Sequence, residues 1–162
     1  MKYTLIVINL TILLSTVEAS DCVRSTPIST MKSNSPYKVT ELNKKTWIYK
    51  EQVEIDPNTK IIIENKGCES YWIEYRIFLS NLDNNVNAYE RLIEVIKAIS
   101  RFNNSSINLV KVISILKKTA EIKIYKGENK ISENELGESF TLSKKKKKDG
   151  TVQFTLSAVV GL

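Results

Sequence analysis

Carboxylates are the residues of this sequence best suited to catalysis. The 162 residues include no histidine and only 2 cysteines, which excludes Ser-His-Asp and Cys-His pairs, imidazole metal sites and four-thiolate zinc sites. None of the 5 glycines falls in a phosphate-binding loop spacing. Glu64, Glu69 and Glu74 lie close together, and two acids can hydrolyse glycosides, but their spacing fixes no separation of the required size. We therefore expect a protein that is not an enzyme and that needs no cofactor and no metal.

Five consecutive lysines are the most concentrated charge in the sequence: Lys144, Lys145, Lys146, Lys147 and Lys148. One interpretation is a cationic finger that binds an anionic envelope polymer, lipid head groups or an acidic protein surface. The other is a solvated hairpin tip whose repulsion discourages edge-to-edge association. Nucleic-acid sites usually combine basic charge with stacking aromatics or arginine. This run has neither, so nucleic acid is not an expected partner.

A second candidate site is a row of alternate positions within residues 71–79. Trp72, Glu74, Arg76 and Phe78 share one parity, and tryptophan and arginine are frequent anchors of protein interfaces. If this face of the strand is open, the row is a contact surface for a protein partner. If helices cover it, Glu74 pairs with Arg76 or with a neighbouring strand and the row is structural.

Residues 1–19 have the pattern of a secretory signal peptide. A positive start precedes an apolar run of about a dozen residues, whereas a membrane-spanning helix needs roughly 20. Val17 and Ala19 occupy the positions that a signal peptidase prefers, so cleavage before residue 20 is expected. An uncleaved anchor helix is the alternative. We expect an exported protein, periplasmic or secreted, in which residues 20–162 form one domain with no transmembrane segment.

Both cysteines, Cys22 and Cys68, would remain after that cleavage. An oxidising compartment and an even number of thiols favour a disulfide between them. In the chain-entropy model, closing a loop of about 46 residues stabilises the fold by roughly 4 kcal/mol. Two separate free thiols are the alternative. Asp21 precedes Cys22 where a lipid-modified cysteine normally follows a small residue, which argues against a lipid anchor.

Hydrophobic periodicity indicates the elements that must position these side chains. Period-two alternation predicts strands, and apolar residues at helical spacing predict helices. An Asp-Gly pair at 149–150 between two alternating runs is typical of a hairpin. The expected elements are an irregular lead-in at 21–45, strands at 47–55, 60–65 and 68–79, helices at 86–102 and 106–118, a strand at 121–126, a polar loop at 128–137, and strands at 138–143 and 151–160.

These elements predict an α+β fold. It would consist of an N-terminal three-stranded antiparallel meander, a helical hairpin and a C-terminal β-hairpin, with the helices packed on one sheet face. Two separate small sheets are the alternative.

Small size, export and scarce catalytic residues favour a protein-binding module of inhibitor or immunity type. Its partner would be another protein in the envelope or outside the cell. The alternative function is binding of anionic polymer or lipid head groups through the lysine-rich hairpin, because the formal charge of +6 attracts anionic surfaces.

Overall fold

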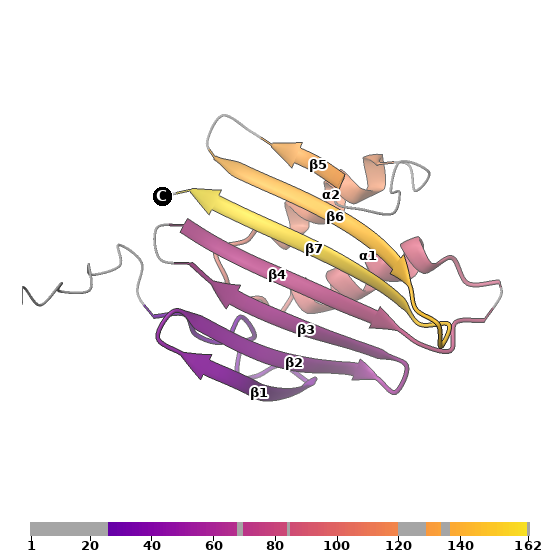
Figure 1. Ribbon diagram of the computed structural model, residues 1–162, viewed down its shortest axis with the longest axis horizontal. Coiled ribbons are helices and arrows are strands. Elements are labelled where there is room, and N and C mark those ends of the chain that lie inside the picture. The colour runs from indigo at the N-terminus through magenta and orange to yellow at the C-terminus, as the bar shows by residue number, and fades with distance from the viewer. Residues whose placement is uncertain (1–25, 68–69, 84, 120–128, 134–136, 162) are drawn as a thin grey trace, which may run out of the picture.

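A computed structural model describes residues 26–67, 70–83, 85–119, 129–133 and 137–161. Within these residues seven strands form one antiparallel sheet in the order β1-β2-β3-β4-β7-β6-β5 (Figure 1). The strands are β1 (Lys38–Lys45), β2 (Ile48–Asp56), β3 (Thr59–Lys66), β4 (Ser70–Leu79), β5 (Asn129–Glu133), β6 (Glu138–Lys146) and β7 (Val152–Gly161). The helices α1 (Ala88–Ser100) and α2 (Leu109–Lys118) lie between β4 and β5 in the chain.

Two meanders meet at the centre of this sheet. The first is β1 to β4 and the second is β5 to β7, and within each the strands pair with their neighbours in the chain. The last strand, β7, then pairs with β4 in continuous register, from Ser70 opposite Gly161 to Leu79 opposite Val152. This long-range pairing joins both halves, so the alternative of two separate sheets is wrong.

The fold predicted from the sequence is also wrong. The first meander has four strands rather than three, because β1 occupies part of the lead-in expected to be irregular. The second has three strands rather than two, because β5 occupies part of the expected loop at 128–137. Every side chain of β1 is exposed, so this edge strand carries no alternating apolar pattern. The strand expected at 121–126 lies outside the described residues.

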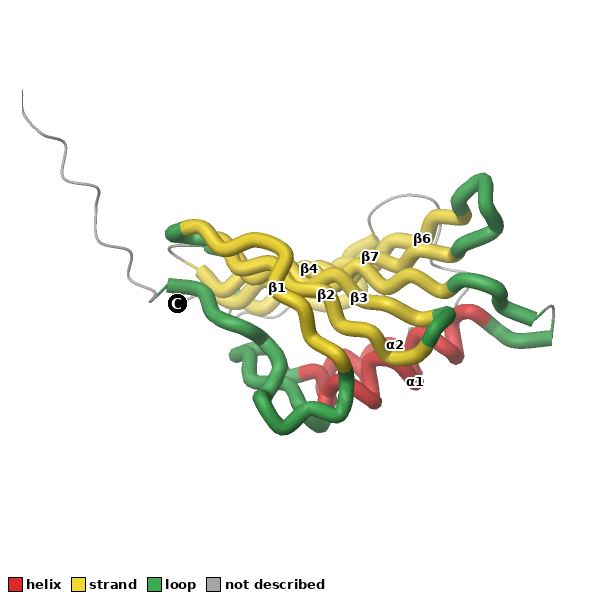
Figure 2. The backbone as a smooth tube through the Cα atoms, turned by 90° about the horizontal axis from the view of Figure 1, so that it is seen from below, coloured by secondary structure: helices red, strands yellow, loops and turns green. Residues whose placement is uncertain are grey.

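Both helices begin at asparagine caps. The side chain of Asn87 accepts hydrogen bonds from the backbone N–H groups of Tyr89 (2.7 Å) and Glu90 (3.3 Å), and that of Asn108 accepts one from Lys111 N–H (3.0 Å). Such caps satisfy N–H groups that have no partner inside the helix. The helices lie against one face of the sheet (Figure 2).

The core lies between the helices and that face of the sheet. β4 supplies Ile73, Tyr75, Ile77 and Leu79, all at most 1 % exposed. The helices supply apolar residues at helical spacing: Leu92, Val95, Ile96 and Ile99 from α1, and Leu109, Val112 and Leu116 from α2. Burying one such aliphatic side chain contributes about 1.5–3 kcal/mol. This packing orients β4 and so determines which of its side chains face away from the helices.

The segment before β1 has no regular secondary structure, but hydrogen bonds join it to the connection between α1 and α2. Met31 is buried in the core. The Lys32 N–H donates to the Phe102 carbonyl (2.8 Å), and the Asn104 N–H donates to the Thr30 carbonyl (2.7 Å). The segment therefore covers part of the core that α1 and α2 leave open.

Candidate binding face

The sheet face opposite the helices is called the open face, because no described helix or strand lies over it (Figure 2). Alternation along β4 turns Trp72, Glu74, Arg76 and Phe78 to this face and the core residues to the other. The register places Lys60, Ile62, Glu64 and Lys66 of β3 and Gln153, Thr155, Ser157 and Val159 of β7 beside them. The sequence left open which face of this strand is uncovered, and the structure places the predicted row on the uncovered one.

Trp72 lies at one end of the row and is 41 % exposed. Its indole Nε1–H donates to the Ser157 hydroxyl on β7 (3.0 Å). From the other side, the Lys66 ammonium lies 4.1 Å from the ring centroid, which is the geometry of a cation–π contact. Neighbours on both adjacent strands therefore hold the ring in place while leaving much of it accessible.

Phe78 lies at the opposite end of the row, and two lysine ammonium groups lie near its ring. The Lys147 ammonium is 4.4 Å from its ring centroid and the Lys60 ammonium is 5.7 Å away. Phe78 as a whole is 8 % exposed. An aromatic side chain on the uncovered face thus has two ammonium groups within reach of its ring, and long lysine side chains can cover apolar surface in this way.

Between these rings, Glu64 is the centre of an ion-pair network. Its carboxylate lies 3.2 Å from the Lys66 ammonium, 3.7 Å from that of Lys50 and 3.5 Å from the Arg76 guanidinium. Arg76 also pairs through Nε with Glu74, which is directly opposite Glu64 across the strands. Partial burial raises the pKa of the Glu64 carboxyl, but the three cations outweigh burial and hold the pKa below its ordinary value.

Strand alternation divides the lysine run between the two faces of the sheet. β6 continues to Lys146, so Lys144 and Lys146 share the face of the buried Phe140 and Leu142, whereas Lys145 is opposite Gln153 on the open face. Lys147 begins the turn, and its ammonium lies over Phe78. Lys148 is exposed in the same turn. Lys145 and Lys147 thus lie on the side of the sheet that carries the β4 row, and only Lys147 contacts that row through Phe78.

Asp149 and Gly150 determine the conformation of the turn between β6 and β7. Gly150 has φ +84°, a conformation that glycine adopts at little cost. The Asp149 carboxylate accepts from the Thr151 N–H (3.0 Å), and this hydrogen bonding lowers the pKa of the fully exposed carboxyl. The turn thereby holds Lys147 close to β4.

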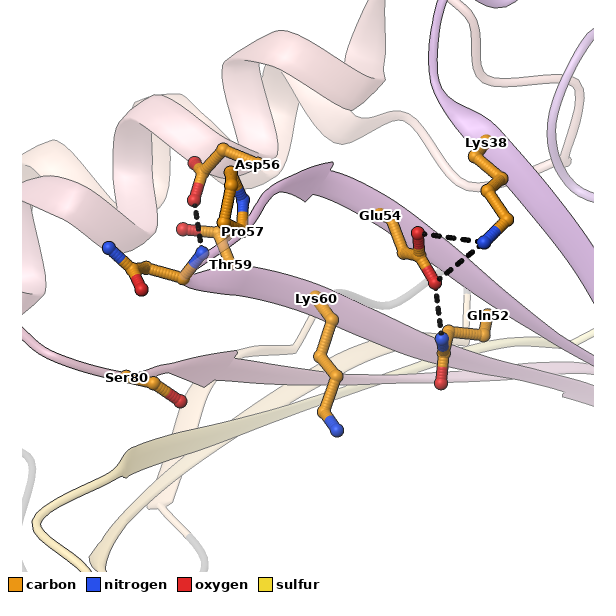
Figure 3. A pocket seen from close by; sticks show the side chains of 9 residues that line it. Lys38, Gln52, Glu54, Asp56, Pro57, Thr59, Lys60 and Ser80 are labelled. Carbon is orange, nitrogen blue, oxygen red and sulfur yellow. Dashed lines mark hydrogen bonds and ion pairs between the residues drawn. The ribbon is translucent and has the colours of Figure 1, made fainter.

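A polar hollow of about 510 Å³ adjoins the open face at the β2–β3 turn (Figure 3). Within it, the Glu54 carboxylate accepts from the Lys38 ammonium (3.2 Å) and from the Gln52 amide (3.0 Å). Lys60 reaches away from that carboxylate (Figure 3). Among the described residues no group of three acidic, cysteine or histidine side chains is arranged to hold a metal ion. Gln52, Glu54 and Lys60 line the hollow from the open face, so the hollow extends that charged surface.

Several predictions concern residues outside the described part of the chain. The signal peptide at 1–19, Cys22, Cys68 and Glu69 all lie there, so cleavage and the disulfide stay predictions. No helix in the described residues is both long and apolar enough to span a membrane.

Sequence reasoning missed Lys60 and Lys66, which complete the aromatic contacts. Both have the parity opposite to the buried Ile61 and Ile63 of β3. Register with β4 then places Lys60 opposite Phe78 and Lys66 opposite Trp72. The alternation was readable from the sequence, but the register that joins it to β4 was not.

Comparisons of this chain with protein-family models, with curated proteins and with solved structures find no significant match.

Proposed function

We propose that this protein is an exported, non-enzymatic binding module of inhibitor or immunity type, and that its open face binds another protein in the envelope or outside the cell. Trp72 carries the proposal, because it is a large aromatic side chain, 41 % exposed, on an uncovered sheet face. Arg76 lies on the same face two residues further along β4. Tryptophan and arginine dominate the binding energy of many protein interfaces.

The immobilised geometry of these anchors also supports a contact surface. Trp72 is held by Ser157 and Lys66, and Arg76 by two carboxylates. Side chains that are already ordered lose less conformational freedom when a partner binds. Ile62 and Val159, both half-buried on this face, add apolar area between the charges.

Two of the three carboxylates considered for catalysis, Glu64 and Glu74, take part in the ion pairs of the open face. Glu64 and Glu74 face each other across β3 and β4, and both contact Arg76. The pKa of Glu64 is lowered, so Glu64 does not fit the role of the acid that protonates a leaving group, which needs a raised pKa.

Division of the lysine run supports a protein partner over an anionic polymer or lipid surface. A polymer-binding finger would present all five charges of Lys144–Lys148 together, but Lys144 and Lys146 lie on the helix side of the sheet. What remains on the open face is a mixture of cations, carboxylates and one exposed aromatic ring. Mixed surfaces of this kind are typical of protein interfaces.

A photoreactive amino acid at Thr155, which is opposite Arg76, tests the proposal in the native host. The matched control carries the same group at Val110, which is 68 % exposed on α2. We expect a discrete protein adduct from position 155 but not from 110, and we expect Trp72→Ala to reduce that adduct. Equal adducts from both positions, or only lipid or polymer adducts from 155, would contradict it.

A further inference from the structure

Phe78 is the meeting point of two cations from different parts of the chain. Lys60 is its direct cross-strand neighbour on β3. Lys147 comes from the β6–β7 turn, and both ammonium groups lie within 6 Å of the ring centroid. Contacts of this kind orient a cation but do not neutralise its charge.

Ion pairing distinguishes these two lysines from the four cations of the open face that contact Glu54 or Glu64. Lys50, Lys66 and Arg76 share Glu64, and Lys38 pairs with Glu54. Within the described residues, neither Lys60 nor Lys147 takes part in an ion pair.

Asp149 is the acid whose charge interacts with Lys147. Its carboxylate is fully exposed and already accepts a hydrogen bond from Thr151. The ammonium groups of Lys60 and Lys147 both lie near the Phe78 ring. Because these two positive charges lie close to one ring, they concentrate positive potential at the Phe78 end of the open face.

We propose that Lys60 and Lys147 form an anion-binding subsite over Phe78 that takes the carboxylate of an acidic side chain from the protein partner. The inference rests on the proposed function, because it names the chemistry of that partner. A carboxylate would accept charge-assisted hydrogen bonds from both ammonium groups. The Phe78 ring is the contact that both ammonium groups share, and the Asp149–Thr151 hydrogen bond lies in the turn that carries Lys147.

A short acidic peptide, acetylated tetraglutamate amide, is the probe for the test. It is titrated into the folded protein at about 0.1 M salt, where the Debye length is about 10 Å, while the Phe78 ring and the amides of Lys60 and Lys147 are followed by NMR. We expect saturable shifts at these three residues. The double variant Lys60→Gln and Lys147→Gln should bind the peptide about tenfold more weakly. A loss of this size corresponds to the removal of at least one charge-assisted hydrogen bond.

The matched control is Lys117→Gln with Lys118→Gln, which removes the same charge from exposed positions at the end of α2. Its affinity should stay within about twofold of the unmodified protein, because solvent screens distant charges. Equal losses in both double variants would mean that net charge alone attracts the peptide, and would overturn the subsite. Tighter binding of inorganic phosphate or of phosphatidylglycerol vesicles than of the peptide would overturn its assignment to a protein carboxylate.

The crosslinking experiment at Thr155 separates the two proposals. If the partner adduct forms but is unaffected by Lys60→Gln with Lys147→Gln, the subsite fails and the proposed function stands. If the peptide binds as expected but no protein adduct forms, the proposed function fails. Loss of both the adduct and the peptide affinity in the double variant supports both.

Discussion

The carboxylate of Glu51, on β2, accepts two hydrogen bonds from Thr30, one from its backbone N–H (2.8 Å) and one from its hydroxyl (2.7 Å). A third comes from the Ser29 hydroxyl (2.6 Å). Glu51 is fully buried, and no ion pair with it occurs among the described residues. Burying a charge is costly unless hydrogen bonds replace its hydration. The segment before β1 supplies these bonds, so Glu51 and this segment stabilise each other.

Replacing Glu51 should therefore loosen that segment and destabilise the whole fold. Glu51→Gln turns an amide N–H₂ toward donors that need an acceptor, and hydrogen bonds to charged groups contribute about 1.5–3 kcal/mol each. We expect a loss of about 2–4 kcal/mol in the free energy of unfolding, measured by urea denaturation. The matched control is Glu54→Gln on the same strand, which breaks an exposed pair with Lys38 and should cost no more than about 1 kcal/mol. Equal losses in the two variants would contradict the anchoring role.

Ile77 and Ile62 test which face of the sheet is the core. Ile77 on β4 is fully buried beneath the helices, whereas Ile62 on β3 is half-buried on the open face. Ile77→Ala should lower the free energy of unfolding by about 2–5 kcal/mol, because it removes transfer energy and leaves a cavity. Ile62→Ala should cost clearly less in the same urea measurement. The opposite order would mean that the face carrying Trp72 is the covered one.

Local periodicity explains how much of the sheet could be predicted from the sequence. β4 alternates over ten residues, so its two sets of side chains are readable without a structure. β1 has no buried side chain and so carries no such pattern. The pairing of Ser70 with Gly161 joins residues far apart in the chain, and no local period encodes it. The fold class was missed because β1 and β5 were not expected as strands and because this pairing was not predicted.

The candidate site shows the same limit. Lys144 to Lys148 look like one cationic tip when the strand is assumed to end at residue 143. Because β6 continues to Lys146, the two-residue period sends adjacent lysines to opposite faces. Placement of Lys147 over Phe78 depends on the turn geometry and on the β4–β7 pairing together. Sequence reasoning could identify both candidate patches, but not that they meet.

Acidification should weaken the ion-pair network around Glu64. Its pKa in the folded protein lies below the ordinary value of 4.5, so the unfolded state binds a proton first. The stabilisation is complete above that value and is lost as the pH falls through the folded pKa. Urea midpoints compared at neutral pH and below pH 4.5 should show a smaller acid-induced loss for Glu64→Gln than for the unmodified protein. An identical loss in both would show that the network contributes nothing to acid sensitivity.

Residues 103–106 contain two overlapping Asn-X-Ser sequons, one at Asn103 and one at Asn104. In a eukaryotic secretory pathway we expect the two asparagines to be glycosylated to different extents. The Asn103 amide N–H₂ already donates to the Ile107 carbonyl (2.8 Å), and its oxygen accepts from the Ser105 hydroxyl (2.8 Å). Asn104 is exposed, and no hydrogen bond of its side chain occurs among the described residues. A glycan on Asn103 would disrupt the connection between α1 and α2, whereas one on Asn104 would extend into solvent.

Glycopeptide mass spectrometry of the secreted protein should therefore find the sugar on Asn104. Ser106→Ala removes only the Asn104 sequon and should abolish modification, although the Asn103 sequon stays intact in that variant. Ser105→Ala removes only the Asn103 sequon and should leave Asn104 modified. A folded product glycosylated at Asn103 would show that the hydrogen bonds of this side chain are dispensable for the helix–helix connection.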